Sequence, residues 1–200
     1  MTRIGIYGGT FSPPHNGHLM AARAFMEQMW LDLLYVIPTA LPPHKEMEAP
    51  ISAEHRLAMC RAAFGGMEGV IVSDCELRRQ GKSYTVDTLR EFYDPENRLF
   101  LLCGTDMMLT LDTWYQAEEI FKLCYPIYIR REDDPILTKR IIAKIAEYQQ
   151  KYGAIVRRVV MDPIVLSSTQ IRKSVAEGRA IDGMVSPAVA EYICTHELYR

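Results

Sequence analysis

Residues 8–19 read GGTFSPPHNGHL, and they join a short apolar run, residues 4–7, to a segment with helical periodicity. The glycines let backbone amides approach an anion, and the start of a helix adds positive partial charge. His15 and His18 lie three residues apart in the first turn, so their imidazoles point the same way. This stretch therefore predicts a strand, a phosphate-binding loop and a helix.

The composition is that of an ordinary globular protein. The chain has 200 residues, 48% of them hydrophobic, which is enough for a full core. We expect a single domain over residues 1–200, with a helical C-terminal part from about residue 165. The formal charge of -2 argues against a general nucleic-acid or membrane-surface binder, since such proteins rely on clustered basic residues. Any anion site must therefore be local.

The cysteines favour a reducing compartment. Five of them are widely spaced, without a C-x-x-C pair, at positions 60, 75, 103, 124 and 194. This spacing supports neither a disulfide framework nor a zinc site. The N-terminus does not resemble a signal peptide, and no apolar run approaches the roughly 20 residues of a membrane span. We therefore expect a cytoplasmic protein without a membrane partner.

Apolar runs alternate with helical segments along the chain. Helices are expected after Ser52, over 86–92, from Thr105 through Trp114 to Leu123, before Gly153, and twice near the C-terminus. The expected strands are residues 4–7, 34–37, 70–72, 99–103, 126–129 and a sixth from 155–156 and 159–161. This alternation predicts an α/β fold with a doubly wound parallel sheet, Rossmann-like, and a small helical C-terminal extension.

Ligands of such sheets bind at the carboxyl ends of the strands, where the strand order reverses. In the usual order that point lies between the first and fourth strands. These strands end in residues 8–10 and 104–106, which read GGT and GTD. We expect these two loops of small residues to be neighbours.

The two histidines suit phosphate contacts better than a metal site, because residues 12–14 offer few further ligands. Nucleotidyl transfer needs charge stabilisation and in-line positioning, with little covalent work for the protein. A phosphate nucleophile is already ionised at neutral pH, so no strong base is required. The alternative is one capping and one packed histidine.

A second anion-binding pattern lies near the C-terminus. Ser168, Thr169 and Arg172 offer hydroxyls, backbone amides and a guanidinium in the first turn of a helix. Such a turn suits a polyphosphate. The alternative is an ordinary capped helix with an exposed arginine.

Five motifs, taken together and in this order, resemble bacterial nicotinate-nucleotide adenylyltransferases. They reach from residue 8 to residue 172 and read G-G-T-F-x-P-x-H-x-G-H, P-P-H-K, G-x-S-Y-T-x-D-T-L, G-x-D with a Trp beyond, and S-S-T-x-I-R. The wider nucleotidyltransferase superfamily shares the first and last motifs, so only the middle motifs narrow the substrate. Ser12 stands where many relatives carry Asp.

The resemblance implies a division of the site residues. The implied catalytic residues are His15, His18 and Arg172. The residues implied to bind ATP are Gly8, Gly9, Thr10, Phe11, His18, Gly104, Asp106, Ser168, Thr169 and Arg172. Those implied to bind nicotinate mononucleotide are Thr10, Lys45, Tyr84, Thr85, Asp106, Trp114 and Tyr115. Three of these have a structural alternative: Trp114 as core, Lys45 as a solvated loop residue and Asp106 as a helix N-cap.

The resemblance also implies the reaction. The phosphate of nicotinate mononucleotide attacks the α-phosphorus of ATP and gives deamido-NAD and pyrophosphate, with Mg²⁺ on the phosphates and no protein residue as a metal ligand. The expected partners are these small molecules, with a homo-oligomer left open. Alternative acceptors are nicotinamide mononucleotide and phosphopantetheine; enzymes for the latter usually carry Thr in place of His15. A nucleotide sensor without activity is a further alternative.

Overall fold

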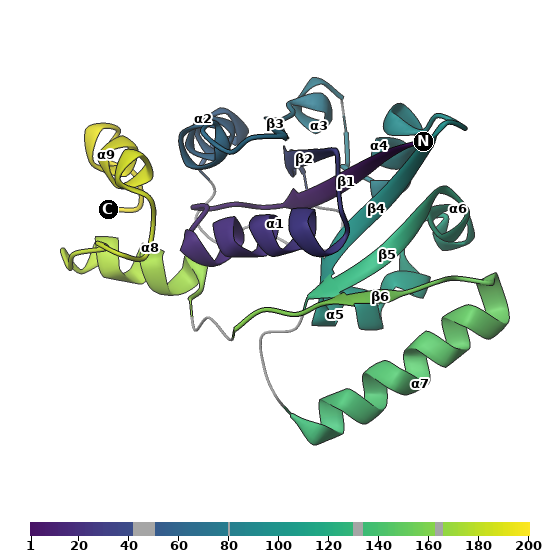
Figure 1. Ribbon diagram of the computed structural model, residues 1–200. Coiled ribbons are helices and arrows are strands. Elements are labelled where there is room, and N and C mark those ends of the chain that lie inside the picture. Colours follow the sequence, from purple (N-terminus) through teal and green to yellow (C-terminus); the bar gives the residue numbers. More distant parts are fainter. Residues whose placement is uncertain (42–50, 80, 130–133, 163–165) are drawn as a thin grey trace. The chain divides into compact units, whose positions relative to one another are not determined.

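Helices and strands alternate along the computed structural model, which describes residues 1–41, 51–79, 81–129, 134–162 and 166–200 (Figure 1). The strands are β1 (Thr2–Gly9), β2 (Leu33–Pro38), β3 (Val70–Val72), β4 (Asn97–Gly104), β5 (Cys124–Ile129) and β6 (Arg157–Val159). The helices are α1 (Asn16–Gln28), α2 (Ala53–Phe64), α3 (Cys75–Arg78), α4 (Thr85–Phe92), α5 (Thr105–Leu109), the 3-10 turn η1 (Leu111–Thr113), α6 (Ala117–Leu123), α7 (Pro135–Tyr152), α8 (Ser168–Ala176) and α9 (Pro187–Thr195).

The six strands form one sheet in the order β3-β2-β1-β4-β5-β6. The pairs β1–β4, β4–β5 and β5–β6 run parallel, with Ile4 opposite Leu99, Leu101 opposite Pro126 and Ile129 opposite Val159. The chain fills one half of the sheet outward from β1 and then returns to place β4 beside β1. This order confirms the prediction of a doubly wound α/β fold whose direction reverses between the first and fourth strands.

The chain divides into two compact units, each assembled from three separate stretches. The first consists of Met1–Tyr7, Arg23–Leu34 and Tyr84–Pro163, and the second of Gly8–Ala22, Tyr35–Ser83 and Ile164–Arg200. The prediction of a single domain with a helical C-terminal part stays a prediction.

The first unit is built around β4, the most apolar strand. Residues 99–103 are all buried, because parallel strands have both faces covered. Helix α7 contributes Ile141 and Tyr148 to the buried interior. Asp134 accepts a hydrogen bond from the Ile136 amide at its start, and Gly153 ends the helix at φ +64°. The predicted end of this helix at Gly153 is therefore confirmed.

In the second unit, helices α2 and α9 pack against each other. Ser52 caps α2 by accepting from the His55 amide, as the sequence predicts. A buried cluster joins these helices to α8, and it includes Met59, Ile171, Val189 and Ile193. The C-terminal helices therefore share an apolar core with the segment that follows β2.

The structure corrects three details of the predicted elements. The helical stretch from residue 105 to 123 breaks into α5, η1 and α6, and Gln116 takes a left-handed conformation at φ +53° just before α6. The short helix α3 was not expected. The sixth strand is shorter than predicted, because both backbone groups of Val160 bond to the side chain of Gln28 instead of continuing the ladder.

Glycine is required in β1 by close packing within the first unit. A Cβ at Gly5 would lie 2.5 Å from Leu31 Cδ1, 2.8 Å from Leu34 Cδ1 and 2.9 Å from Phe25 Cε1. We expect Gly5→Ala to lower the free energy of unfolding by about 1–3 kcal/mol through overpacking, measured by urea denaturation. Gly66→Ala is the control, since a Cβ there meets nothing within 4 Å. Equal stability of the two variants would contradict this account.

Candidate functional site

The loop after β1 is held in an unusual backbone conformation. Phe11 lies at φ +46°, in the left-handed region that side chains other than glycine rarely adopt. Its ring is 2% exposed and packs edge-on against His18, with centroids 5.1 Å apart, and against Phe64 at 6.0 Å. Packing of the ring therefore holds the turn in place.

Three carbonyl groups of this loop accept hydrogen bonds from side chains of the second unit. Arg56 Nη1 donates to the Thr10 carbonyl at 3.0 Å. Arg172 Nη1 donates to the Ser12 carbonyl at 2.9 Å, and Ser168 Oγ donates to the Pro13 carbonyl at 2.9 Å. Carbonyl oxygens repel an anion, so donors that hold them favour a loop able to receive a phosphate.

The two histidines form a stacked pair. Their ring centroids are 3.7 Å apart with an interplanar angle of 30°, and His15 is only 2% exposed. The His15 backbone N–H donates to His18 Nδ1 at 3.1 Å. In neutral His18 the proton therefore lies on Nε2, which makes Nε2 a hydrogen-bond donor.

This arrangement bears on the alternative of one capping and one packed histidine. His18 does accept from a backbone amide, and His15 is buried. Both observations are compatible with a donor at His18 Nε2. The structure therefore agrees with a packed His15 and a capping His18. It also leaves His18 Nε2 able to donate to a phosphate.

Ser12 has a specific partner far along the chain. Its hydroxyl is 3.1 Å from the Tyr199 hydroxyl, and its side chain is largely buried. Burial raises the pKa of Tyr199 to about 12, so the phenol is protonated at neutral pH. The residue that departs from the frequent Asp therefore joins the loop to the segment after α9. Sequence reasoning missed Tyr199, because nothing local marks a contact across 187 positions.

The C-terminal motif lies beside the loop within the second unit. Ser167 caps α8 by accepting from the Gln170 amide at 3.1 Å. Ser168 and Arg172 contact the loop carbonyls, and Arg172 Nη2 also donates to Thr169 Oγ1 at 3.2 Å. The structure therefore brings together the predicted residues Gly8, Gly9, Thr10, Phe11, His15, His18, Ser168, Thr169 and Arg172, all of which belong to this unit.

The remaining described site residues belong to the first unit. Gly104 is the N-cap of α5 and Asp106 lies exposed in its first turn, so the alternative of Asp106 as the N-cap is wrong. Tyr84 precedes α4 and Thr85 begins it. The ring of Tyr84 lies 4.6 Å from that of Tyr115, which is 50% exposed. Two aromatic rings therefore lie together at the start of α4.

Trp114 follows η1, and helix α7 holds this turn in place. Tyr148 Oη lies 2.8 Å from the Met108 carbonyl and 3.0 Å from Asp112 Oδ1. Lys144 Nζ is 2.8 Å from Asp112 Oδ2. Sequence reasoning assigned Tyr148 only to the apolar face of its helix. Trp114 itself is half-buried, so neither the core alternative nor the pocket prediction is excluded.

One predicted residue and one unpredicted contact concern the loop after β2. Lys45 lies outside the described residues. Ser83, in the middle of the G-x-S-Y-T motif, accepts from the amides of Ala40 and Leu41 at 3.2 and 3.3 Å. This serine therefore fixes the end of β2, a role that the motif alone did not reveal.

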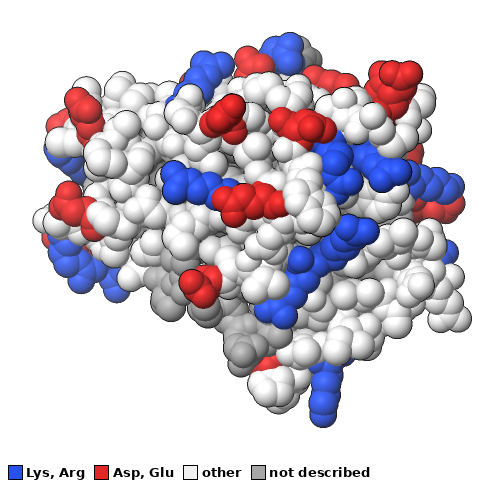
Figure 2. Space-filling view, viewed as in Figure 1, with Lys and Arg blue, Asp and Glu red and all other residues white. Residues whose placement is uncertain are grey.

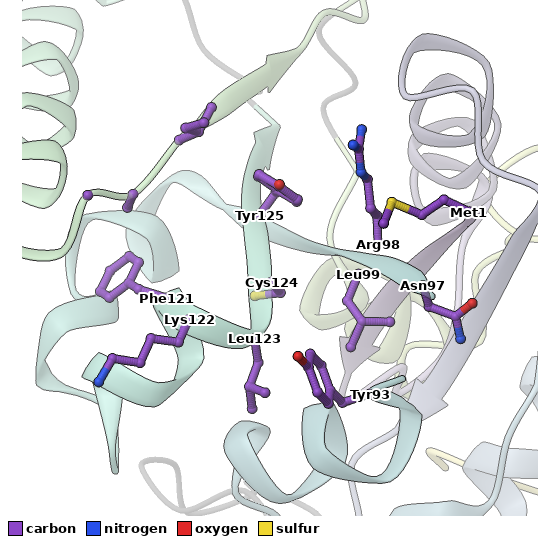
Figure 3. Close-up of a pocket in the computed structure, with 13 residues that line it drawn as sticks. Met1, Tyr93, Asn97, Arg98, Leu99, Phe121, Lys122, Leu123, Cys124 and Tyr125 are labelled. Carbon is purple, nitrogen blue, oxygen red and sulfur yellow. The ribbon is translucent and has the colours of Figure 1, made fainter. Parts of the chain in front are cut away.

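A hollow of about 410 Å³ lies at the amino-terminal ends of β4 and β5 in the first unit (Figure 3). Its lining includes Tyr93, Arg98, Lys122 and Tyr125. None of the predicted site residues that the structure describes lines it. Within the first unit, the hollow lies at the other end of β4 from Gly104 and Asp106.

Three further features of the described residues concern charged surfaces, metal sites and membrane-spanning helices. On the face drawn in Figure 2, basic and acidic side chains are interspersed among uncharged ones. Within the described ranges, no three His, Cys, Asp or Glu side chains gather into a candidate metal site. No described helix has the length and apolar character needed to cross a membrane.

Comparisons with known proteins identify the class to which this fold and loop belong. The family model of cytidylyltransferase-like proteins matches residues 6–174. The chain is 39% identical over 209 residues to the probable nicotinate-nucleotide adenylyltransferase of Pseudomonas syringae pv. tomato, covering 99% of this chain and 94% of the relative. The protein of that name from a Synechococcus species is 38% identical over 204 residues, covering 98% and 94%.

The chain therefore belongs to the nicotinate-nucleotide adenylyltransferase family within the cytidylyltransferase-like proteins. Among solved structures, Plasmodium falciparum nicotinic acid mononucleotide adenylyltransferase complexed with NaAD is similar with a TM-score of 0.75. That likeness covers 100% of this chain and 98% of the other, at 18% sequence identity. At this identity it supports the fold alone.

The His18 tautomer can be measured directly. We expect long-range ¹H–¹⁵N spectra to show neutral His18 protonated at Nε2, because Nδ1 accepts from the His15 amide. His196 is the internal control: its Nδ1 lies 3.0 Å from the Tyr192 carbonyl, which can only accept. His196 should therefore show the opposite pattern, with the proton on Nδ1. The same tautomer at both positions would contradict the assignment.

The stability that the turn before Trp114 contributes should depend on pH. Burial alone would raise the pKa of Asp112, but hydrogen bonds from Lys144 and Tyr148 outweigh it and lower the pKa below its usual value. This stabilisation is present above the unfolded-state pKa of about 3.9 and is lost as the pH falls through the lower folded-state value. We expect the free energy of unfolding, measured by urea denaturation, to fall less between pH 5 and pH 2.5 in Asp112→Asn than in the wild type. An unchanged difference would rule out this role of Asp112.

Proposed function

We propose that this chain transfers the adenylyl group of ATP to nicotinate mononucleotide and releases deamido-NAD and pyrophosphate. The observation that supports this most is the stacked histidine pair at a loop whose carbonyls are held by Arg56, Arg172 and Ser168. The curated relatives named nicotinate-nucleotide adenylyltransferase match nearly the full length of the chain. The loop supports nucleotidyl transfer, and the relatives support nicotinate mononucleotide as the acceptor.

In this proposal the residues of the second unit bind ATP and the reacting phosphates. The loop residues supply backbone contacts, and His18 donates from Nε2 to a phosphoryl oxygen whose charge grows in the transition state. His15 packs against His18, with ring centroids 3.7 Å apart, and so supports the orientation of that ring. Arg172, with Ser168 and Thr169, contacts the triphosphate with the guanidinium donors that remain after its bond to the Ser12 carbonyl.

The acceptor is proposed to be bound by residues of the first unit, and by Thr10 and Lys45. Thr85 and the Tyr84–Tyr115 pair are proposed to receive the nicotinate carboxylate and the pyridine ring, with Trp114 stacking on that ring. Gly104 and Asp106 are proposed to contact the nucleotides, Asp106 through ribose hydroxyls. Lys45 stays in the proposal as an added positive charge.

The chemistry is an in-line displacement that needs little covalent help from the protein. The phosphate oxygen of nicotinate mononucleotide, already ionised at neutral pH, forms a bond to the α-phosphorus of ATP, and the bond to the β-phosphate oxygen breaks. The leaving group is pyrophosphate. The protein binds, orients and supplies donors where negative charge develops.

Mg²⁺ is proposed to arrive as its ATP complex. This ion commonly keeps water and substrate phosphate oxygens as ligands, and the described residues do not gather a set of carboxylates for it. When bound, it would neutralise phosphate charge. No residue of the chain is proposed as its ligand.

A cytoplasmic location belongs to the same proposal. No disulfide joins any of the five cysteines, and Cys60, Cys75, Cys103 and Cys124 are buried. Burial raises the pKa of Cys103 to about 12, so this thiol stays protonated and fills core space.

Pyrophosphate release tests the proposed function. We expect release with ATP, Mg²⁺ and nicotinate mononucleotide, and much less with nicotinamide mononucleotide. Preferential release with the amide would favour the alternative acceptor, and no release with either pyridine nucleotide would contradict the proposal. We expect His18→Ala to lower kcat by about 100-fold or more, since it removes a donor to the transferring group.

His196→Ala is the matched control for His18→Ala. His196 is exposed and lies after α9, so its loss should leave turnover near that of the wild type. Near-normal turnover of His18→Ala would exclude the proposed contact.

A further inference from the structure

The largest fully buried side chain of the described residues is a cation that the proposed chemistry does not use. Arg56, in α2, is 0% exposed. Burial lowers the pKa of its guanidinium, which reflects the free-energy cost of keeping a charge away from water. Its Nε is buried and has no hydrogen-bond partner within the described part of the chain. An apolar residue would avoid these costs, so the arginine calls for a specific explanation.

The donors of Arg56 end on the backbone at the ends of two strands. Nη1 donates to the Thr10 carbonyl at 3.0 Å, after β1, and Nη2 lies 3.3 Å from the Ala40 carbonyl, after β2. The Thr39 amide also donates to the Gly9 carbonyl at 2.9 Å. A planar guanidinium reaches two carbonyls at once, which a lysine ammonium does less readily. Arg56 therefore fixes the two strand ends together.

The same helix also contacts Phe11, the residue that follows Thr10. Phe64, the last residue of α2, packs edge-on against the Phe11 ring. Phe11 needs such support, because its left-handed backbone is strained and persists only where surrounding contacts impose it. The Phe11 ring in turn lies edge-on against His18. Helix α2 thus reaches the His18 ring through one intermediate residue.

We propose that Arg56 is a positioning residue for adenylyl transfer: by holding the Thr10 carbonyl it fixes Phe11 and, through the Phe11 ring, the orientation of the His18 imidazole. This inference rests on the proposed function for its kinetic consequence and on the contacts of the second unit for its structural one. Arg56 itself contacts no substrate in this account.

The variants Arg56→Met and Arg56→Lys test the proposal. We expect Arg56→Met to lower kcat about 10- to 100-fold, because a shift of the transferring group by about 1 Å has effects of this size. The KM for nicotinate mononucleotide should change less than kcat, since Arg56 holds only Thr10 among the residues proposed to contact it, and the proposed pyridine contacts lie on other residues. Arg56→Lys keeps the positive charge but cannot donate to two carbonyls in the geometry of a guanidinium. Its kcat should therefore lie between those of Arg56→Met and the wild type. Arg61→Met, at an exposed position of the same helix, is the control.

A second readout needs no substrate. In Arg56→Met, the ¹⁵N signals of His18 should lose the single Nε2-protonated pattern, while those of His196 stay unchanged. Phe64→Leu, which loosens Phe11 from its other side, should give the same change at His18. If Arg56→Met does not fold, Arg56→Lys and Phe64→Leu carry the test. Folded variants with wild-type His18 signals would overturn the proposal.

The two readouts separate this proposal from the proposed function. If the wild-type chain releases no pyrophosphate, the proposed reaction fails, yet the His18 signals still decide whether Arg56 positions the ring. If the wild type is active and the folded Arg56 variants match it in kcat, the positioning role fails while the reaction stands.

Discussion

The hydrogen bonds that side chains donate to the carbonyls of residues 10, 12 and 13 are the constraint on which the second unit depends. An anion-binding turn must direct amides toward its ligand, and each carbonyl turned away must still find a donor. The donors come from α2 and α8, which lie far from the loop in sequence. The loop conformation therefore depends on both helices. The apolar cluster that joins α2, α8 and α9 holds these helices together.

Much of the fold follows from local patterns in the sequence. Ser52, Ser186 and Asp134 cap their helices through contacts within three residues, and Gly153 ends a helix because it takes a positive φ. The strands follow from short apolar runs between turn residues, and the sheet order follows from their alternation with helices. The glycine and histidine spacing of the first loop and the serines before α8 are equally local signals.

What could not be predicted depends on contacts between distant segments. Arg56 reads as a charged residue on an ordinary helix, and only the folded chain turns it inward onto Thr10 and Ala40. The left-handed conformation of Phe11 needs a neighbour from α2, and β6 is short because Gln28 supplies partners for Val160. Tyr148 looked like one apolar position among several, yet its hydroxyl holds the turn before Trp114. Periodicity shows that a face is buried, but it does not show which polar atom on that face finds a partner.

The contact between Ser12 and Tyr199 has a consequence for the order in which the chain is made. Ribosomes build proteins from the N-terminus, so the first loop emerges long before the tyrosine, 187 positions later, that bonds its serine. Arg56 is available early, whereas Ser168, Arg172 and Tyr199 arrive late. A nascent chain thus carries the loop without most of its hydrogen-bond partners. Bringing such distant residues together costs chain entropy, which only the packing of the later helices offsets. The loop can therefore form all the contacts of its final shape only after Tyr199 has been synthesised.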